Sequence, residues 1–540
     1  MFHDRRLDGD STTKPLVLAQ STRSRETAAA YCDRATCGTG PSMRAMFAFL
    51  IALGVAGLAG AATVQPLVHQ PPSPVGLPLL LTDGTVMFES GIGDPRWWKL
   101  TPDASGSYLR GTWTSLASFP SAWNYAPFAA ATAVLADGRV LIEGGEYNPV
   151  DGPFPLTNKG AVYDPVADAW TQVAPPPGWD FIGDATSIVM PNGKFLLGNK
   201  LDMRIAELDP ATMTWTELGS AGKADFNAEE GWTLLPDGSF LTVDVLATPN
   251  SERYTYVDAP GGGHWASMGP TPVSLTWNYG LAPVPYPGGI YDPPGETGPC
   301  MLRPNRTVFC TGASDETPAT TAHTAIFDPD SGVWTAGPDF LPGDDADDAS
   351  ATLLPSGHVL VSAPSGRLYK YDGSAFAPVF SGHGGLLITL PTGEALISGA
   401  AVEIYTPDAS PAPDPAWAPT ITGAPARVSP GGRYAITGTQ FNGLSQAQAL
   451  GDELQAPTNY PLVRIVHRAS GHVAYARTHD HSSMGVATGS LVVSTTFDVP
   501  AGIDLGPSDL YVVANGIASE PVSVNVVSLR GHSHHARASR

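Results

Sequence analysis

Apolar runs that meet at short polar turns dominate the chain between residues 79 and 396. The clearest example covers residues 231–245, where one apolar run reaches Pro236-Asp237-Gly238 and a second apolar run follows. Pro and Asp suit the two central positions of a type I turn, and Gly suits the left-handed position after them. The pattern therefore predicts a β-hairpin with a three-residue loop and two largely buried arms.

This hairpin pattern occurs seven times, at intervals of roughly 35 to 70 residues. The other copies are residues 79–87, 133–141, 188–196, 301–309, 352–360 and 388–396. Most are followed by a second pattern: Tyr163-Asp-Pro with Trp170, Leu208-Asp-Pro with Trp215, Phe327-Asp-Pro with Trp334, and Tyr405-Thr-Pro. Four strands at this period are typical of a propeller blade. We therefore predict an all-β chain with a seven-bladed kelch-type β-propeller over residues 63–408. Unrelated hairpins in a sandwich are the alternative.

The two ends of the predicted propeller are expected to join. The seventh copy, from about residue 382, reaches Tyr405 without the Trp-bearing last strand. A ring of blades closes without open edges when an N-terminal strand completes the last blade. We expect residues near 63–72 to supply that strand.

Residues 409–418 are rich in Pro and predict a linker. Closely spaced strand patterns follow over residues 419–528, which predicts an immunoglobulin-like β-sandwich. The polar tail 529–540 contains three His residues that could bind metal loosely, but an unstructured tail is the preferred interpretation.

The N-terminal region has the features of a targeting segment. Residues 1–42 show no strand or helix pattern, whereas residues 43–61 contain Arg44, a short apolar core and small residues near the end. These features predict a secretory signal peptide, with translation starting at Met43 and residues 1–42 disordered or mis-annotated. The apolar stretch is short for a membrane span, so we expect none after cleavage. A retained signal anchor is the alternative.

The two cysteines after the predicted signal peptide are placed so that they could form a disulfide, as expected for a secreted protein. Cys300 and Cys310 flank one hairpin so that they lie opposite each other across its two strands. This spacing permits a cross-strand disulfide in an oxidising compartment, and two buried thiols are the alternative.

Composition narrows the class of partner. The chain has 59 Gly and 52 Pro, and only 15% of its residues are charged, as expected for a turn-rich globular protein. The net charge of -22 argues against nucleic acid or an anionic membrane as a partner. We expect a monomer that binds a small molecule.

The segment Tyr475-Ala-Arg-Thr-His-Asp-His-Ser-Ser-Met484, together with the blades and the C-terminal strands, resembles the galactose oxidase and glyoxal oxidase family of kelch proteins. The resemblance implies that a loop with a Thr-His pair threads the propeller axis and that its His binds copper. His479 is the matching residue, and His481 is the alternative in register.

Other residues of the family's copper-radical site have no match here. Ala129 stands where the resemblance implies the radical Tyr, and the nearest phenol, Tyr125, is out of register. No Cys lies between residues 38 and 299 to form the cross-link. His383 stands near the family's Tyr-His pair, without the Tyr. A thioether-linked tyrosyl radical is therefore not expected, nor is ordinary galactose oxidase activity.

Acidic residues recur just before the predicted inner strands. Measured from the turn of each hairpin, Asp184, Glu229 and Asp348 lie seven residues upstream, and Glu296 and His383 eight. Residues at this height gather at one end of a propeller axis. We therefore predict a metal site of Asp184, Glu229, Glu296, Asp348, His383 and His479. Oxygen ligands favour Ca²⁺, Mg²⁺ or Mn²⁺, and copper is the family alternative. Alternatively, the acids rim a solvated opening or pair with Arg204 or Lys223.

Aromatic residues near the same end suit a sugar ring, and we select Trp123, Tyr125 and Trp179 as candidate substrate-binding residues. Packing between blades is the alternative for each. The preferred function is a secreted protein that binds or acts on carbohydrate or a small polar ligand, with His383 or Asp348 as catalytic base. The alternatives are a copper oxidase of alcohols or aldehydes using His479, His383 and Tyr125, and a non-catalytic interaction protein.

Overall fold

The computed structural model describes residues 60–91, 93–148, 156–277, 284–286, 290–292, 295–314, 320–451 and 455–528. The predicted N-terminal segment 1–42, nearly all of the predicted signal peptide 43–61 and the tail 529–540 lie outside these ranges. In the ranges described, no helix has both the length and the apolar character needed to cross a membrane.

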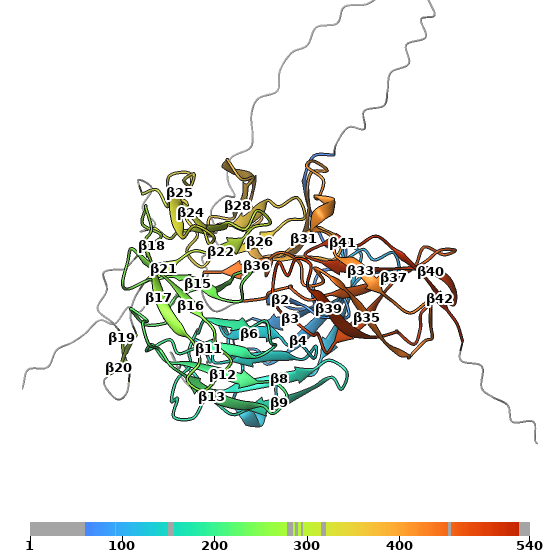
Figure 1. Cartoon of the computed structure of the whole chain (residues 1–540), viewed down its shortest axis with the longest axis horizontal. Coiled ribbons are helices and arrows are strands. Elements are labelled where there is room, and N and C mark those ends of the chain that lie inside the picture. Colours follow the sequence, from blue (N-terminus) through green and yellow to red (C-terminus); the bar gives the residue numbers. More distant parts are fainter. Residues whose placement is uncertain are drawn as a thin grey trace, which may run out of the picture. The chain divides into compact units, whose positions relative to one another are not determined.

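Seven antiparallel sheets form the blades of a β-propeller (Figure 1), as the repeated hairpins predicted. Blade 1 contains β2 (Val75–Leu80), β3 (Val86–Ser90), β4 (Trp97–Thr101) and β5 (Thr112–Leu116). Blade 2 contains β6 (Ala131–Val134), β7 (Val140–Glu143), β8 (Gly160–Asp164) and β9 (Ala169–Val173). Blade 3 contains β10 (Ser187–Val189), β11 (Phe195–Gly198), β12 (Ile205–Asp209) and β13 (Thr214–Leu218). Blades 4 and 5 contain β14 (Thr233–Leu234), β15 (Phe240–Val243), β16 (Asn250–Thr255) and β17 (His264–Pro270); β22 (Cys300–Leu302), β23 (Val308–Thr311), β24 (Thr324–Asp328) and β25 (Val333–Ala336).

Blades 6 and 7 complete the ring. They contain β26 (Ser350–Leu353), β27 (Val359–Ser362), β28 (Arg367–Tyr371) and β29 (Phe376–Ser381); β30 (Gly385–Thr389), β31 (Ala395–Gly399), β32 (Val402–Thr406) and β1 (Thr63–Pro66). Between blades 4 and 5 lie two short pairs, β18 (Thr276–Trp277) with β21 (Glu296–Thr297) and β19 (Val284–Tyr286) with β20 (Ile290–Asp292). Two 3-10 helices are described, η1 (Ser121–Trp123) and η3 (Pro415–Trp417).

The predicted turn chemistry is present in the inner hairpins. In blade 4 the Gly238 N–H donates to Leu235 O at 3.0 Å, and Gly238 has a φ of 83°. In blade 5 Arg306 takes the same left-handed position with a φ of 71°. This conformation keeps the hairpin in register, so that Cys300 lies opposite Cys310 and the predicted disulfide forms.

The N-terminal strand closes the ring, as predicted from the short seventh repeat. Strand β1 pairs antiparallel with β32, with Val64 opposite Tyr405. Gln70 extends the pairing, because its side chain donates to Val402 O at 2.9 Å and accepts from the Val402 N–H at 2.9 Å. The last blade therefore presents a paired edge instead of an open one.

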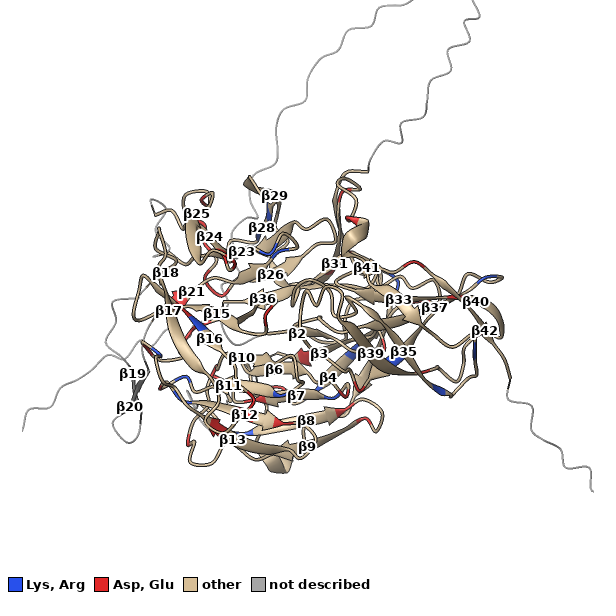
Figure 2. Ribbon diagram, in the orientation of Figure 1, with Lys and Arg blue, Asp and Glu red and all other residues tan. Residues whose placement is uncertain are grey.

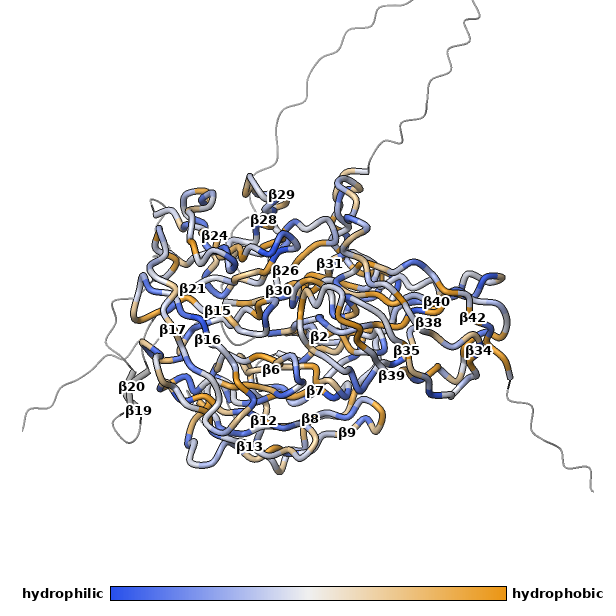
Figure 3. Tube along the Cα trace, in the orientation of Figure 1, coloured by the Kyte–Doolittle hydropathy of each residue, from blue (hydrophilic) through white to orange (hydrophobic). Residues whose placement is uncertain are grey.

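The C-terminal strands form a second β-structure with its own core. Its sheet order is β33-β35-β39-β38-β37-β40-β42-β34, with β41 paired to β40. The core is apolar and includes Ile436, Val463, Phe497, Leu510 and Val524; Figure 3 shows apolar residues along strands throughout the molecule. The strands are β33 (Thr420–Gly423), β34 (Arg427–Val428), β35 (Arg433–Thr439), β37 (Leu462–His467), β38 (Val473–His479), β39 (Val492–Asp498), β40 (Gly506–Ala514), β41 (Ile517–Ala518) and β42 (Val522–Val526). The immunoglobulin-like class stays a prediction.

This C-terminal region contacts the turn ends of the blades. The N–H groups of Thr478, His481 and Met484 donate to the carbonyls of Thr82, Ala136 and Pro191, at 3.0 to 3.1 Å. These carbonyls belong to the hairpin turns of blades 1, 2 and 3. The starts of the inner strands therefore lie at the opposite end of the propeller axis.

The part of the chain that enters the axis is residues 441–451 and 455–460, and this corrects the expectation that the Thr478-His479 loop would do so. Strand β36 (Gln448–Leu450) lies in this part of the chain and pairs with β26, the inner strand of blade 6. The Leu234 N–H of blade 4 donates to Gln446 Oε1 at 2.7 Å, and the Thr132 hydroxyl of blade 2 donates to Gln455 O. Contacts to inner strands of three separate blades place the segment on the axis.

We predict that removing the closing strand costs far more stability than trimming a terminus does. A chain that begins at Ser73 loses the β1 pairing, the Gln70 bonds and the burial of Leu67. At about 1 kcal/mol per hydrogen bond, the loss is on the order of 3 to 6 kcal/mol. Thermal unfolding measures it, with a chain that begins at Gly60 as the control. Unchanged hydrogen exchange of the β32 amides would contradict the prediction.

Candidate ligand site at the axial mouth

Two acidic residues that precede inner strands meet one buried lysine. Asp184 lies before β10 and Glu229 before β14, whereas Lys200 follows β11. Lys200 Nζ donates to Asp184 Oδ2 and lies 2.5 Å from Glu229 Oε1. The Lys200 side chain is 1% exposed. An ammonium group therefore stands between these carboxylates, where the sequence predicted a metal ion.

Three further carboxylates converge at blades 5 and 6. Glu296 lies on β21, and Asp347 and Asp348 lie just before β26. One oxygen from each lies within 4.8 Å of the others, a spacing that could hold a metal ion. Desolvation by the surrounding residues raises the pKa of Asp348 although the residue itself is exposed at the surface, and the positive charge of Lys200 opposes that rise. This electrostatic interaction brings the acidic triad and the Lys200 group to the same end of the axis.

The backbone at this end is turned in the same unusual way in two blades. Glu229 has a φ of 55° and Asp348 a φ of 48°, both in the left-handed region. Side chains other than Gly adopt this region at a cost of about 1 kcal/mol or more, and such residues cluster at functional sites. The structure thus holds both carboxylates at the end of the axis where the inner strands begin, called the mouth below, at the expense of local strain.

Other acids of the same loop have structural partners. Asp344 accepts hydrogen bonds from Arg367 Nη1 at 2.7 Å and from the Tyr369 hydroxyl at 2.5 Å. Asp345 Oδ2 accepts from the Ser314 hydroxyl at 3.0 Å. Figure 2 shows acidic residues distributed over many blades, so acidity alone does not mark the site.

The two predicted imidazole ligands have partners outside the predicted metal site. His383 Nδ1 lies 2.9 Å from Glu403 Oε2 on β32 of its own blade. His479 Nδ1 lies 2.8 Å from Asp480 Oδ2, and its Nε2 lies 3.3 Å from Asp498 Oδ2. His479 is also beside the turn ends, about 20 Å along a strand from the mouth at roughly 3.3 Å per residue. The structure does not bring His479 or His383 together with the acidic residues.

The candidate aromatic residues are packing residues. Tyr125 and Trp179 are buried, the Tyr125 hydroxyl donates to Gly144 O at 2.9 Å, and Arg204 lies 5.3 Å from the Trp179 ring. Trp123 is half-buried and packs against Phe119. These contacts favour the packing alternative over a platform for a sugar ring.

The copper alternative needs Tyr125, His383 and His479 around one ion. Tyr125 and His383 precede the inner strands β6 and β30, whereas His479 lies beside the turns at the opposite end of the axis. The described residues thus provide no assembled copper set of this composition.

Sequence reasoning missed Lys200 because it considered only residues before each inner strand. Lys200 follows the second strand of a hairpin, which returns to the same end of the axis. Applying the same register to second strands would have found it. That register also places Glu89 and Glu143 at the ends of β3 and β7.

Glu89 and Glu143 are buried carboxyl groups close to the mouth end. Neither oxygen of Glu143 has a hydrogen-bond partner among the described residues, and burial raises its pKa well above the usual range. Burial also raises the pKa of Glu89 to about 7, although the hydrogen bond from the Leu77 N–H lowers it.

Comparisons with known proteins give distant similarity. No protein-family model matches the chain. A kelch-like protein, terF, from Aspergillus terreus is 34% identical over 90 residues, which is 17% of this chain and 18% of that protein. The chain thus matches less than a fifth of this relative's length.

Solved structures match the chain at low identity and with TM-scores below 0.5. A fungal alcohol oxidase in complex with copper has a TM-score of 0.46 and 14% identity, over 87% of this chain and 100% of that chain. Virginiamycin B lyase from Staphylococcus aureus has a TM-score of 0.40 and 12% identity, over 64% of this chain and 98% of that chain. These values transfer no activity to this chain.

We predict that Lys200→Met destabilises the protein strongly, because Asp184 and Glu229 lose the ammonium group between them. Removing one partner from a buried ion pair costs about 3 to 5 kcal/mol. Thermal unfolding measures the loss, with Lys99→Met as the charge-matched control. The triple variant Asp184→Asn, Lys200→Met, Glu229→Gln should recover much of it. Equal midpoints for Lys200→Met and Lys99→Met would refute the ion-pair account.

We predict that Glu89 makes stability fall as pH rises from about 4.5 to about 7. In this window the native state keeps a proton that the unfolded state has released, because the pKa of Glu89 is about 7 in the fold. The Glu89→Gln variant should therefore gain on the order of 2 to 3 kcal/mol relative to the wild type between pH 4.5 and 8. Unfolding midpoints across this range measure the difference. The exposed Glu217→Gln should show no such trend, and a pH-independent difference for Glu89→Gln would exclude the assignment.

Proposed function

We propose that the axial mouth binds a divalent cation through Glu296, Asp347 and Asp348, and through that cation a hydroxylated small molecule of the carbohydrate class. The convergence of three carboxylates within 4.8 Å carries the proposal. Three negative charges at this spacing repel one another, and a divalent ion removes most of that repulsion.

The ligand chemistry indicates the class of ion. The three proposed ligands are carboxylates, which suit hard cations such as Ca²⁺, Mg²⁺ or Mn²⁺. A copper site would be expected to include imidazole, and His383 and His479 are paired with Glu403 and Asp480. We therefore propose a hard cation at this site in place of copper.

Three protein ligands leave positions on a hard cation for oxygen atoms of a bound molecule. Vicinal hydroxyl groups of a sugar supply such oxygens, and the Asp184–Lys200–Glu229 group offers further hydrogen-bonding atoms at the same end of the axis. His383 has no part in this proposal.

We also propose that the protein acts outside the cytoplasm. The Cys300–Cys310 disulfide supports this, because disulfides persist mainly in oxidising compartments. The short apolar segment near residue 50 supports it as well.

Metal binding by the purified, chelator-treated protein tests the proposal. We expect calorimetry with Ca²⁺, Mg²⁺ and Mn²⁺ to show a site that Asp348→Asn and Glu296→Gln each weaken at least tenfold, because each variant removes one anionic ligand. Glu217→Gln is the charge-matched control and should bind as the wild type does.

Binding of a mixed panel of neutral and acidic sugars should then depend on the added cation. Unchanged metal affinity in Asp348→Asn and Glu296→Gln would remove the site. Metal binding without any sugar binding would contradict the proposed carbohydrate ligand and would support the proposed cation site.

A further inference from the structure

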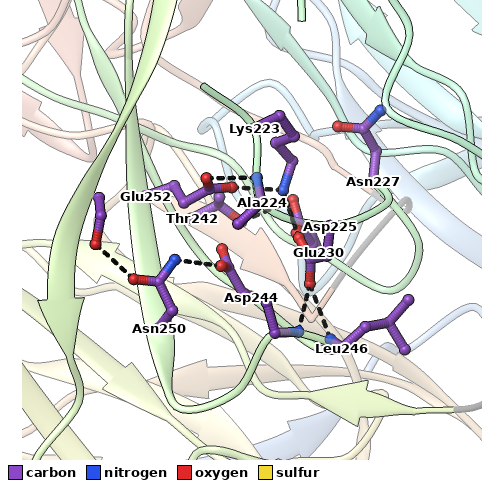
Figure 4. A network of polar contacts seen from close by, with 12 residues as sticks. Lys223, Ala224, Asp225, Asn227, Glu230, Thr242, Asp244, Leu246, Asn250 and Glu252 are labelled. Carbon is purple, nitrogen blue, oxygen red and sulfur yellow. Dashed lines mark hydrogen bonds and ion pairs between the residues drawn. The ribbon is translucent and has the colours of Figure 1, made fainter. Parts of the chain in front are cut away.

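A second group of acidic residues lies inside blade 4, away from the triad at blades 5 and 6. Asp225 and Glu230 lie before β14, Asp244 follows β15, and Glu252 lies on β16. Lys223 joins them, and Figure 4 shows the five side chains directed toward one another. Their exposed fractions are 6%, 0%, 0%, 1% and 8%, in that order. The group is thus almost completely removed from solvent.

Lys223 serves three of the four carboxylates. Its Nζ donates to Asp225 Oδ1 at 2.8 Å, to Glu230 Oε1 at 2.7 Å and to Glu252 Oε2 at 2.8 Å. A lysine ammonium group has three N–H donors, so these bonds use all of them. Asp244 therefore receives no hydrogen bond from Lys223.

Asp244 is left incompletely satisfied. Its Oδ2 accepts from Asn250 Nδ2 at 2.5 Å, but its Oδ1 is buried and has no hydrogen-bond partner among the described residues. A buried carboxylate oxygen without a partner is costly unless the group takes up a proton or a cation. Figure 4 shows Asp244 directed into the group, between Glu252 and Asp225.

The charges in the group do not balance. Four carboxylates against one ammonium leave three excess negative charges if all are ionised. The group therefore has room for additional positive charge.

The spacing of the ligand atoms fits a cation. One oxygen from each of Asp225, Asp244 and Glu252 lies within 4.8 Å of the others. Two oxygens on opposite sides of Ca²⁺ are separated by roughly twice the Ca–O distance of about 2.4 Å. Each carboxylate oxygen has two lone pairs, so Asp225 and Glu252 can bind an ion and Lys223 together.

We propose that Asp225, Asp244 and Glu252 form a structural Ca²⁺ site within blade 4. Ca²⁺ is favoured over Mg²⁺ because Mg²⁺ usually keeps several of its waters, whereas these ligands are buried. The ion binds Asp244 Oδ1 and removes most of the excess negative charge. Binding fixes the loop before β14 against β15 and β16, so the ion stabilises the blade and takes no part in ligand binding at the mouth.

The test uses the full-length chain carrying Asp348→Asn, so that it does not depend on the proposed site at the mouth. After chelator treatment at pH 7.5, 1 mM CaCl₂ should raise the unfolding midpoint by about 3 to 6 °C. Adding Asp244→Asn should abolish this rise. Glu143→Gln, which also neutralises a buried carboxyl group but lies in blade 2, should retain it.

A second measurement applies if the Asp244→Asn variant fails to fold. Lys223 Nζ lies 5.0 Å from the centre of the Trp265 ring, so Tb³⁺ bound beside Lys223 would be excited through that tryptophan. Tb³⁺ luminescence should be displaced by Ca²⁺ and should fall several-fold in Trp265→Phe.

Two outcomes would overturn the proposal. The first is a midpoint that ignores Ca²⁺ and rises only on acidification, which would show that the group holds protons instead. The second is a Ca²⁺ response that persists in Asp244→Asn, which would place the ion elsewhere.

Discussion

The inner strands of a propeller leave backbone groups unpaired around its axis, and the segment formed by residues 441–451 and 455–460 satisfies a part of them. Strand β36 extends blade 6, while Gln446 accepts from the inner strand of blade 4. The Tyr460 hydroxyl donates to Leu80 O of blade 1. Because an unpaired buried backbone group is costly, this segment ties the C-terminal strands to the propeller as one folding unit. The candidate site residues therefore lie at the end of the axis where the inner strands begin.

One lysine fills a position where the sequence alone suggested a metal ion, and a second lysine joins an acidic group that the sequence analysis did not single out. Lys200 lies between Asp184 and Glu229, and Lys223 contacts three carboxylates of blade 4. The net charge of -22 suggested that the acidic residues lack enough lysine and arginine side chains to compensate them. The net charge does not show where each lysine lies in the fold. Where a lysine reaches the acids, no ion is required. The groups that exceed the capacity of the nearest lysine are the ones that call for another cation.

Local pattern determined the fold well, since turn chemistry is encoded within a few residues. The Asp-Gly and Asn-Gly turns located the hairpins, and the register of one hairpin gave the Cys300–Cys310 disulfide. The missing last strand of blade 7 identified β1 as its partner.

The site was predicted less well, because it depends on side chains that reach across blades. Asp347, Asp348 and Glu296 do meet, whereas His479 lies at the turn end. The stretch between β35 and β37 has no regular pattern, which hid its axial role, although a long loop inside a compact domain is itself an indication of function.

The described acidic groups differ in how their negative charge is compensated, and this difference decides which of them can bind an ion. Asp184 and Glu229 share one ammonium group, so their charges are largely compensated and an added cation gains little. Neither oxygen of Glu143 has a hydrogen-bond partner among the described residues, and burial raises its pKa well above the usual range, so a proton is its simplest neutral state. The triad Glu296, Asp347 and Asp348 and the set Asp225, Asp244 and Glu252 each gather three ligand oxygens within one coordination sphere. A cation can relieve several repulsions at once only where carboxylates converge in this way, because a proton neutralises just one of them.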